Sequence, residues 1–226
     1  MTGPRPAVVV LVAGTGTDMG KTWVSARLLE TWRRSGLSVA ARKTAQSFDP
    51  GTELTDAHVL GGASGEDPAT VCLPARWYTV AMAPPMAAAS LGRSGPTTAE
   101  LLAELVWPKR AVDVGLLETA GGVRSPQAID GDVMTVVDAV APDHIVLVAD
   151  AGLGTVNAVR LSVTALTEPL PSGRRHDPVV FLNRYDPSSE LHRRNRDWLR
   201  HTDGFSVWEA TTVGFGPLAE RLAARP

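Results

Sequence analysis

Short aliphatic runs alternate along the chain with longer stretches of helical periodicity. Five of these runs are apolar without a regular polar alternation, which is typical of strands buried on both faces of a sheet. They are AVVVLVA from Ala7, SVAARK from Ser38, VDVGLLE from Val112, HIVLVAD from His144 and PVVFLN from Pro178.

The segment between the first two runs predicts an amphipathic helix. In KTWVSARLLETWRRSG, Val24, Leu28, Leu29 and Trp32 fall on one face, and Gly36 can end the helix. A strand, a helix and a second strand form a β-α-β unit. Repetition of this unit predicts an α/β fold with a mostly parallel sheet and helices on both faces.

A glycine-rich stretch, GTGTDMGKT from Gly14 to Thr22, follows the first aliphatic run. The usual phosphate-binding loop, G-x-x-x-x-G-K-[ST], requires a glycine where this chain has Thr15. A longer loop still offers backbone N–H groups, a lysine and a hydroxyl to a triphosphate and its Mg²⁺. The pattern therefore favours a P-loop NTPase over a glycine-rich turn without a ligand, and it nominates Gly16, Thr17, Asp18, Met19, Gly20, Lys21 and Thr22 for nucleotide binding.

Polar residues close four of the other predicted strands, namely Lys43, Glu118, Asp150 and Asn183. Ligands of parallel α/β sheets collect at the carboxyl ends of the strands, so these groups should gather near the loop. A helix cap or an ordinary loop residue is the preferred interpretation of Asp150. Glu118 precedes Ala120-Gly121-Gly122, which favours a metal or phosphate role.

Asp56, in LTDAHV, has two interpretations of equal weight: a second Mg²⁺ carboxylate or a helix cap. Lys43 would be an ordinary solvated lysine if the polar segment TAQS did not follow it directly.

Length and composition place limits on the function. The 226 residues can form one substantial core without a sharp change in composition, which predicts a single domain over residues 1–226. A net charge of -2 gives no general reason to bind nucleic acid or an anionic membrane. One cysteine, Cys72, excludes an internal disulfide and suits a reducing cytoplasm. The run Ala7 to Ala13 is too short to span a bilayer.

A basic run, HRRNRDWLRH from His192 to His201, raises the alternative of a nucleic-acid surface. Leu191, Trp198 and Leu199 instead give it one apolar side at helical spacing, which leaves the arginines on a solvated face. The five histidines show no metal-ligand spacing.

Several motifs together resemble the dethiobiotin synthetase family, from roughly residue 8 to residue 220. They are the loop GTGTDMGKT, Lys43 with Ser47 four residues on, Thr55-Asp56, ETAGGV from Glu118, GLGTVN from Gly152 and the strand-end Asn183. The loop of that family has the longer GTxTxxGKT spacing, which this chain matches.

The resemblance implies a Mg-ATP-dependent carboxylation with ring closure, in which 7,8-diaminopelargonate and CO₂ give dethiobiotin, ADP and phosphate by way of a carbamate and a carbamic-phosphoric anhydride. It implies that Lys21, Lys43 and Thr17 act in catalysis and that Thr22, Asp56 and Glu118 hold Mg²⁺. The residues implied for the substrate are Thr17, Asp18, Lys43, Ser47, Gly121 and Gly122.

The resemblance also implies a homodimer whose active site is completed across the interface. Gly154, Thr155, Val156 and Asn157 would begin a helix whose exposed N–H groups hold the substrate carboxylate of the other subunit. The alternative is that Thr155 simply caps this helix.

Two segments depart from the family pattern. Ala83-Pro84-Pro85-Met86 stands where the family often has Ser-Pro-His, and Gly214-Phe215-Gly216-Pro217 stands where the family usually has Gly-x-Ile-Pro. The second segment and Asn183 are expected to contact the base of the nucleoside triphosphate.

Two rivals are weaker. A partition or positioning ATPase usually opens its loop with a lysine and carries an amphipathic membrane tail, whereas this loop opens with Gly14-Thr15 and PLAERLAARP is short. A cobyrinate-type amidotransferase would need a glutaminase domain with a nucleophilic cysteine, whereas Cys72 in TVCLPA is most simply a small buried hydrophobe.

Overall fold

A computed structural model describes residues 3–210 and 214–225. Its strands are β1 (Val8–Gly14), β2 (Val39–Lys43), β3 (Gln46–Ser47), β4 (Trp77–Tyr78), β5 (Val114–Gly122), β6 (Pro126–Ala128), β7 (Gly131–Asp132), β8 (His144–Asp150), β9 (Val179–Asn183) and β10 (Val207–Glu209). Its helices are α1 (Lys21–Arg34), α2 (Asp56–Ser64), α3 (Pro68–Val71), α4 (Pro84–Ser90), α5 (Thr98–Glu104), α6 (Val133–Val140), α7 (Thr155–Thr167), α8 (Glu190–Asp197) and α9 (Gly216–Ala223), with a short 3₁₀ helix η1 (Pro74–Arg76) and a π-helical turn η2 (Trp198–Thr202).

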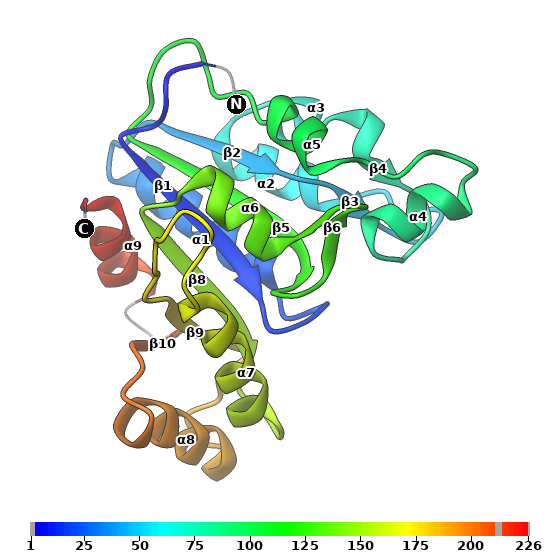
Figure 1. Cartoon of the computed structure of the whole chain (residues 1–226). Coiled ribbons are helices and arrows are strands. Elements are labelled where there is room, and N and C mark those ends of the chain that lie inside the picture. Colours follow the sequence, from blue (N-terminus) through cyan, green and yellow to red (C-terminus); the bar gives the residue numbers. More distant parts are fainter. Residues whose placement is uncertain (1–2, 211–213, 226) are drawn as a thin grey trace.

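Six strands form the central sheet in the order β10-β9-β8-β1-β5-β2, and every neighbouring pair is parallel. Figure 1 shows the strands running through the middle of the molecule, with helices in front of the sheet and behind it. The expected α/β fold with a parallel sheet between helices is therefore confirmed. Two small two-stranded sheets, β3-β4 and β6-β7, flank the end of the sheet where the loops gather.

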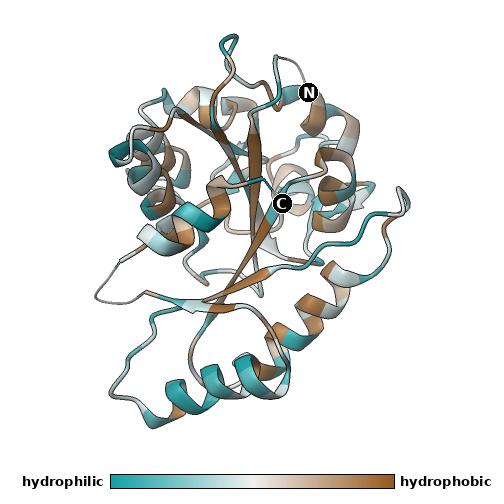
Figure 2. Ribbon diagram, turned by 90° about the vertical axis from the view of Figure 1, so that its left-hand side faces the viewer, coloured by the Kyte–Doolittle hydropathy of each residue, from teal (hydrophilic) through white to brown (hydrophobic). Residues whose placement is uncertain are grey.

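Alternation along each strand divides the core into two layers. In β1, Val8, Val10 and Val12 pack against α1, α2 and α9, whereas Val9 and Leu11 pack against α6 and α7. Both faces of the strand are therefore apolar, as the unbroken aliphatic runs predicted. Figure 2 shows the central strands in the brown of hydrophobic residues.

The five strands expected from the aliphatic runs are all present, and each starts within two residues of its expected start. The short strand β10 was not predicted, because its three residues give too little pattern to read. One boundary was wrong: Glu118 does not close its strand, since β5 continues to Gly122. The glycines that follow Glu118 pair with the loop end of β1, with Gly122 opposite Gly14, and so extend the strand.

The basic run forms α8 and η2, and the structure corrects its expected apolar side. Leu199 is buried, but the side chains of Leu191 and Trp198 are 41% and 49% exposed. The π-helical turn shifts the register after Asp197, and Arg160 covers the Trp198 ring at 5.9 Å. Of the arginines expected on a solvated face, only Arg194 is fully exposed, whereas Arg193, Arg196 and Arg200 are half-buried.

Two observations bear on membranes. None of the helices built from the described residues has both the length and the apolar character to cross a bilayer. Helix α9, which contains most of the PLAERLAARP segment, packs Leu218 and Leu222 into the core and accepts a hydrogen bond from Trp32 Nε1 at the Ala219 carbonyl, 2.8 Å long.

Candidate active site

A cavity of about 730 Å³ lies at the carboxyl ends of β1, β2 and β5. Many residues nominated from the sequence line it: Thr17, Asp18, Gly20, Lys21, Thr22, Lys43, Ser47, Asp56, Glu118 and Gly121. The structure adds other residues to its wall, namely Ala45, Gln46, Phe48, Asp49, Thr52, Ala81, Met82, Ala83, Pro84, Ala120, Ser125 and Arg184.

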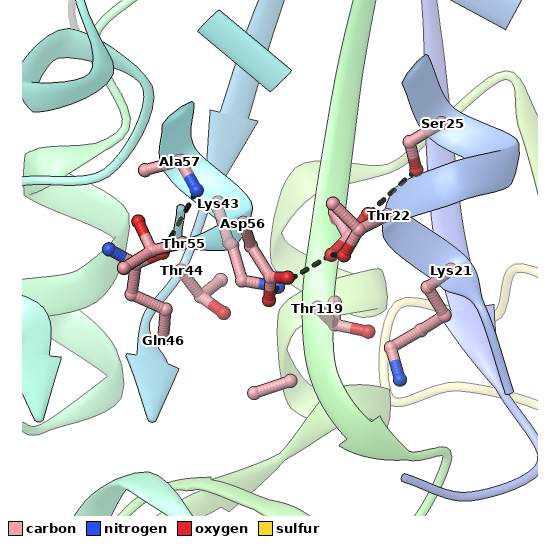
Figure 3. Close-up of polar contacts among 12 residues, drawn as sticks. Lys21, Thr22, Ser25, Lys43, Thr44, Gln46, Thr55, Asp56, Ala57 and Thr119 are labelled. Carbon is pink, nitrogen blue, oxygen red and sulfur yellow. Dashed lines mark hydrogen bonds and ion pairs between the residues drawn. The ribbon is translucent and has the colours of Figure 1, made fainter. Parts of the chain in front are cut away.

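The ammonium group of Lys43 lies between two carboxylates. Its Nζ is 2.5 Å from Glu118 Oε1 and 2.9 Å from Asp56 Oδ2, and Figure 3 shows Lys43 and Asp56 side by side. Lys43 and Glu118 meet because they are paired in the register of β2 and β5. Burial alone would lower the pKa of Lys43, but the charges of Glu118 and Asp56 outweigh it and hold that pKa above its usual range. The two carboxylates therefore favour the protonated, cationic form of Lys43.

Helix α1 contributes two hydroxyl groups to the same cluster. Thr22 Oγ1 donates to Glu118 Oε1 at 2.8 Å, and Ser25 Oγ donates to Glu118 Oε2 at 2.7 Å. Glu118 has no exposed surface, so its carboxylate cannot be solvated by bulk water. Two hydroxyls and one ammonium stabilise it instead. Burial tends to raise the pKa of Asp56, but Lys43 and the Thr22 hydroxyl bring it below its usual range.

Lys21 is the first residue of α1 and folds back on the phosphate loop, where its Nζ donates to the Gly16 carbonyl at 3.2 Å. Burial and the nearby charge of Lys43 lower the pKa of Lys21. An anion entering the loop would relieve the repulsion between the two ammonium groups, which is a physical reason for this site to take a polyphosphate.

Two consecutive residues at the carboxyl end of β9, Asn183 and Arg184, bind the backbone of the phosphate loop. Asn183 Nδ2 donates to the Met19 carbonyl at 2.9 Å, and Arg184 Nη2 donates to the Asp18 carbonyl at 2.8 Å. Asp18 and Arg184 both have positive φ, 58° and 54°, a region that costs an L-residue about 1–2 kcal/mol. The contacts between these strained residues keep the loop in one shape.

Gly20 lies directly beneath this clamp. Its φ is 85°, and a Cβ at this position would lie 2.0 Å from Asn183 Nδ2. We expect Gly20→Ala to lower the free energy of unfolding by more than about 1–2 kcal/mol, because the strain of positive φ adds to this clash. Chemical denaturation measures the change.

The matched control is Gly36→Ala, which has a φ of 83° but no neighbouring atom within 4 Å of the added Cβ. It isolates the backbone strain. Equal losses in the two variants would contradict a close approach of Asn183 to the loop.

The glycines after Glu118 bring the end of β5 against the phosphate loop. A Cβ on Gly122 would meet the Thr15 carbonyl at 3.2 Å and Gly16 Cα at 3.3 Å. Gly121 has a φ of 66° and faces the Ser125 hydroxyl. Gly121 thus lines the cavity, whereas Gly122 packs against the backbone of the phosphate loop at Thr15 and Gly16.

The residues nominated for Mg²⁺ offer a hydroxyl and two carboxylates, which are the hard oxygen ligands that this ion prefers. Asp56 and Glu118 lie on either side of Lys43 Nζ, and the Thr22 hydroxyl donates to Glu118, so the Lys43 ammonium occupies the space between the two carboxylates. This donor set fits Mg²⁺ together with phosphate oxygens. In the described part of the chain, no three His, Cys, Asp or Glu side chains are grouped to hold a metal by themselves.

The residues nominated to bind the nucleoside base already make contacts within the fold. The Phe215 ring is 9% exposed and stacks on Phe181 with the ring centroids 5.2 Å apart, so it belongs to the core. Gly216 and Pro217 begin α9 rather than continue a loop. The Asn183 amide group is engaged with Met19, which leaves Oδ1 as an acceptor. Gly214, with a φ of 72°, lies two residues before the start of α9.

The start of α7 lies outside the cavity of its own chain, since Gly154, Thr155, Val156 and Asn157 do not line it. The cap residue of this helix is Gly154, and the Thr155 hydroxyl donates to the Asp150 carbonyl instead. The simple capping interpretation of Thr155 is therefore wrong. The interpretation of Asp56 as a helix cap is wrong as well, because Thr55 is the cap residue of α2.

Sequence reasoning missed Ser25, Gln46 and Arg184. Ser25 and Gln46 are fully buried polar residues, and a polar residue on the inner face of a helix or beside a strand end is a usable signal. Gln46 Oε1 accepts a hydrogen bond from the Ala57 backbone, 2.9 Å long, and so fixes the helix that carries Asp56. Cys72 is buried, and burial raises the pKa of its thiol to about 12, in keeping with a structural role.

A family profile described as an AAA domain matches residues 9–203. The chain is 34% identical over 222 residues to the ATP-dependent dethiobiotin synthetase BioD of Rhodococcus jostii (strain RHA1), a match that covers 93% of this chain and 89% of that protein. It is 34% identical over 229 residues to the protein of the same name from Phenylobacterium zucineum (strain HLK1), covering 95% of this chain and 94% of that protein. The chain therefore carries an AAA-type domain and belongs to the dethiobiotin synthetase family of ATP-dependent ligases.

Proposed function

We propose that this chain converts 7,8-diaminopelargonate, CO₂ and ATP into dethiobiotin, ADP and phosphate. The observation that supports this most is the Lys43 ammonium held between Asp56 and Glu118, in one cavity with Lys21 and the phosphate loop. Relatives that are about one third identical over most of their length carry the name of this activity.

The proposed reaction begins when one amine of the substrate takes up CO₂ as a carbamate. A carbamate oxygen then attacks the γ-phosphate, and the second amine displaces phosphate from the mixed anhydride. Lys43 and Lys21 lower the energy of the negative charge that passes from the carbamate to the transferred phosphoryl group.

Each of the remaining side chains has a defined part in this proposal. Thr17, Asp18 and Ser47 orient the diamine. Thr22, Asp56 and Glu118 would hold Mg²⁺, and a bound Mg²⁺ would supply positive charge beside the phosphate oxygens. Asn183 and the segment from Gly214 to Pro217 border the base. Because Lys43 keeps its proton, it acts as an electrostatic stabiliser and not as a base.

The test is an assay with bicarbonate, Mg-ATP and the diamine, in which phosphate and dethiobiotin are measured together. One phosphate released per dethiobiotin formed is expected. Nucleotide hydrolysis without dethiobiotin, stimulated by a partner protein or a membrane, would contradict the proposal and favour a partition-type ATPase.

We further propose that residues 1–226 act as one domain in the cytoplasm and that two copies form a homodimer. Exposed apolar side chains just before α7 and midway along it support such an interface: Leu153 is 92% exposed and Leu161 is 66% exposed. The N–H groups at Gly154, Thr155, Val156 and Asn157 would then reach the partner's cavity. Full activity in a species shown to be monomeric by sedimentation would contradict this arrangement.

A further inference from the structure

The Lys43 ammonium lies where the proposed function requires a divalent cation. Its Nζ is 2.5 Å from Glu118 Oε1 and 2.9 Å from Asp56 Oδ2, and these are the two carboxylates proposed for Mg²⁺. Magnesium binds carboxylate oxygens at about 2.0–2.1 Å, so an ion bound to both of these oxygens would lie against Nζ. Two cations repel each other strongly at such a distance. The ammonium and the metal ion therefore compete for one space.

Both carboxylate oxygens of Glu118 are already engaged, and they differ in access. Oε2 accepts a hydrogen bond from Ser25 Oγ at 2.7 Å, and Ser25 is fully buried and does not line the cavity. Oε1 accepts from Thr22 Oγ1 at 2.8 Å and also contacts Lys43 Nζ. Figure 3 shows Thr22 on α1 facing Lys43 and Asp56. A metal ion that binds both Thr22 and Glu118 thus approaches Oε1, where Lys43 lies.

The ammonium has another place to go when it leaves the carboxylates. Lys43 lines the cavity of about 730 Å³ together with Lys21 and residues of the phosphate loop. Its flexible four-carbon stem allows Nζ to move while the backbone of β2 stays in place. A buried ammonium that loses its counter-charges needs new ones. Under the proposed function, oxygens of the phosphates and of the carbamate supply them within the same cavity.

We propose that Lys43 is a displaceable counterion, which gives up its place between Asp56 and Glu118 when a divalent cation binds with the nucleotide and then turns its ammonium toward the reacting oxygens. This inference rests on the proposed function. Without nucleotide, the ammonium blocks both carboxylates, so the protein binds a divalent cation weakly. The metal ion is thereby coupled to catalysis, since the stabilising charge of Lys43 reaches the reacting oxygens only after the ion has bound.

The first test follows the Lys43 side chain by NMR in the full-length wild-type protein. Labelling with ¹³C-lysine gives few signals, because the chain has only three lysines, Lys21, Lys43 and Lys109. Spectra are compared with saturating AMP-PNP, a non-hydrolysable ATP analogue, in EDTA and in Mg²⁺, with Lys21 reporting that the loop is occupied in both. The Lys43 Cε resonance should move on addition of Mg²⁺, and exposed Lys109 should not respond. A Lys43 signal that ignores Mg²⁺ would overturn the inference.

The second test measures the competition itself, by titrating Mn²⁺, a spectroscopic substitute for Mg²⁺, into nucleotide-free protein. Lys43→Met should tighten Mn²⁺ binding by about 10-fold or more, because the two carboxylates lose their competing cation. The matched control Lys21→Met removes another buried lysine of the cavity, whose Nζ contacts the Gly16 carbonyl instead of a carboxylate, and should tighten binding much less. Unchanged or weaker Mn²⁺ binding in Lys43→Met contradicts the displacement, and so does equal tightening in both variants.

The two tests keep the displacement separate from protein stability and from the proposed reaction. If Lys43→Met does not fold, the NMR measurement on the wild-type protein decides. A Lys43 signal that responds to Mg²⁺ in a protein that forms no dethiobiotin supports the displacement and contradicts the proposed function. Dethiobiotin formation by a protein whose Lys43 signal ignores Mg²⁺ has the opposite meaning.

Discussion

Lys21→Ala and Lys43→Ala are each expected to reduce turnover by about 10³-fold, since loss of one preorganised charge or donor at a reacting centre has an effect of that order. The two losses should differ in kind. Lys21 contacts the phosphate loop itself, so its loss should weaken nucleotide binding as well as phosphoryl transfer. Lys43 is held by Glu118 and Asp56, so its loss should act mainly on formation and phosphorylation of the carbamate.

Nucleotide titration and single-turnover kinetics separate these two effects. The chain has only three lysines, and Lys109, which is exposed, provides the matched control. Lys109→Ala should keep wild-type turnover and nucleotide affinity. Near-normal turnover in Lys43→Ala would mean that the end of β2 is not part of the reacting centre.

Glu118→Gln is expected to have the second large effect, on both stability and Mg²⁺ dependence. The substitution removes the main counter-charge of a buried ammonium, and breaking a buried ion pair costs about 3–5 kcal/mol of the free energy of unfolding. It also removes one of the two carboxylates proposed for Mg²⁺. Activity should therefore require a higher Mg²⁺ concentration, and Asp56→Asn should shift it in the same direction with a smaller loss of stability, because Asp56 is partly exposed.

Glu66→Gln separates the two consequences. Glu66 pairs with the buried Arg42 at 2.8 Å and accepts from the Ala41 backbone, but it does not line the cavity. This control should lose stability and keep the wild-type Mg²⁺ dependence, as measured by urea denaturation and by Mg²⁺ titration of turnover. An unchanged Mg²⁺ requirement in Glu118→Gln and Asp56→Asn would exclude both carboxylates as metal ligands.

The amino-acid sequence determined the elements of this protein whose signal is local. Aliphatic runs such as AVVVLVA encode strands that are apolar on both faces, and the following GTGTDMGKT encodes a turn into a helix. Because parallel strands end at one edge of their sheet, the pattern also predicted that Lys43, Glu118 and the loop would lie together. Their meeting in one cavity agrees with that reasoning.

The tertiary structure alone decided which groups touch. Ser25 bonds to Glu118 across 93 positions, and Arg184 bonds to Asp18 across 166, and neither pair shares a local pattern. Trp198 and Leu191 have the spacing of a buried face, yet both are exposed, and a π-helical turn interrupts the α-helical spacing from Trp198 onward. Periodicity reports the tendency of a segment to bury one side, whereas contacts between distant segments depend on strand order and register, which only the packed sheet determines.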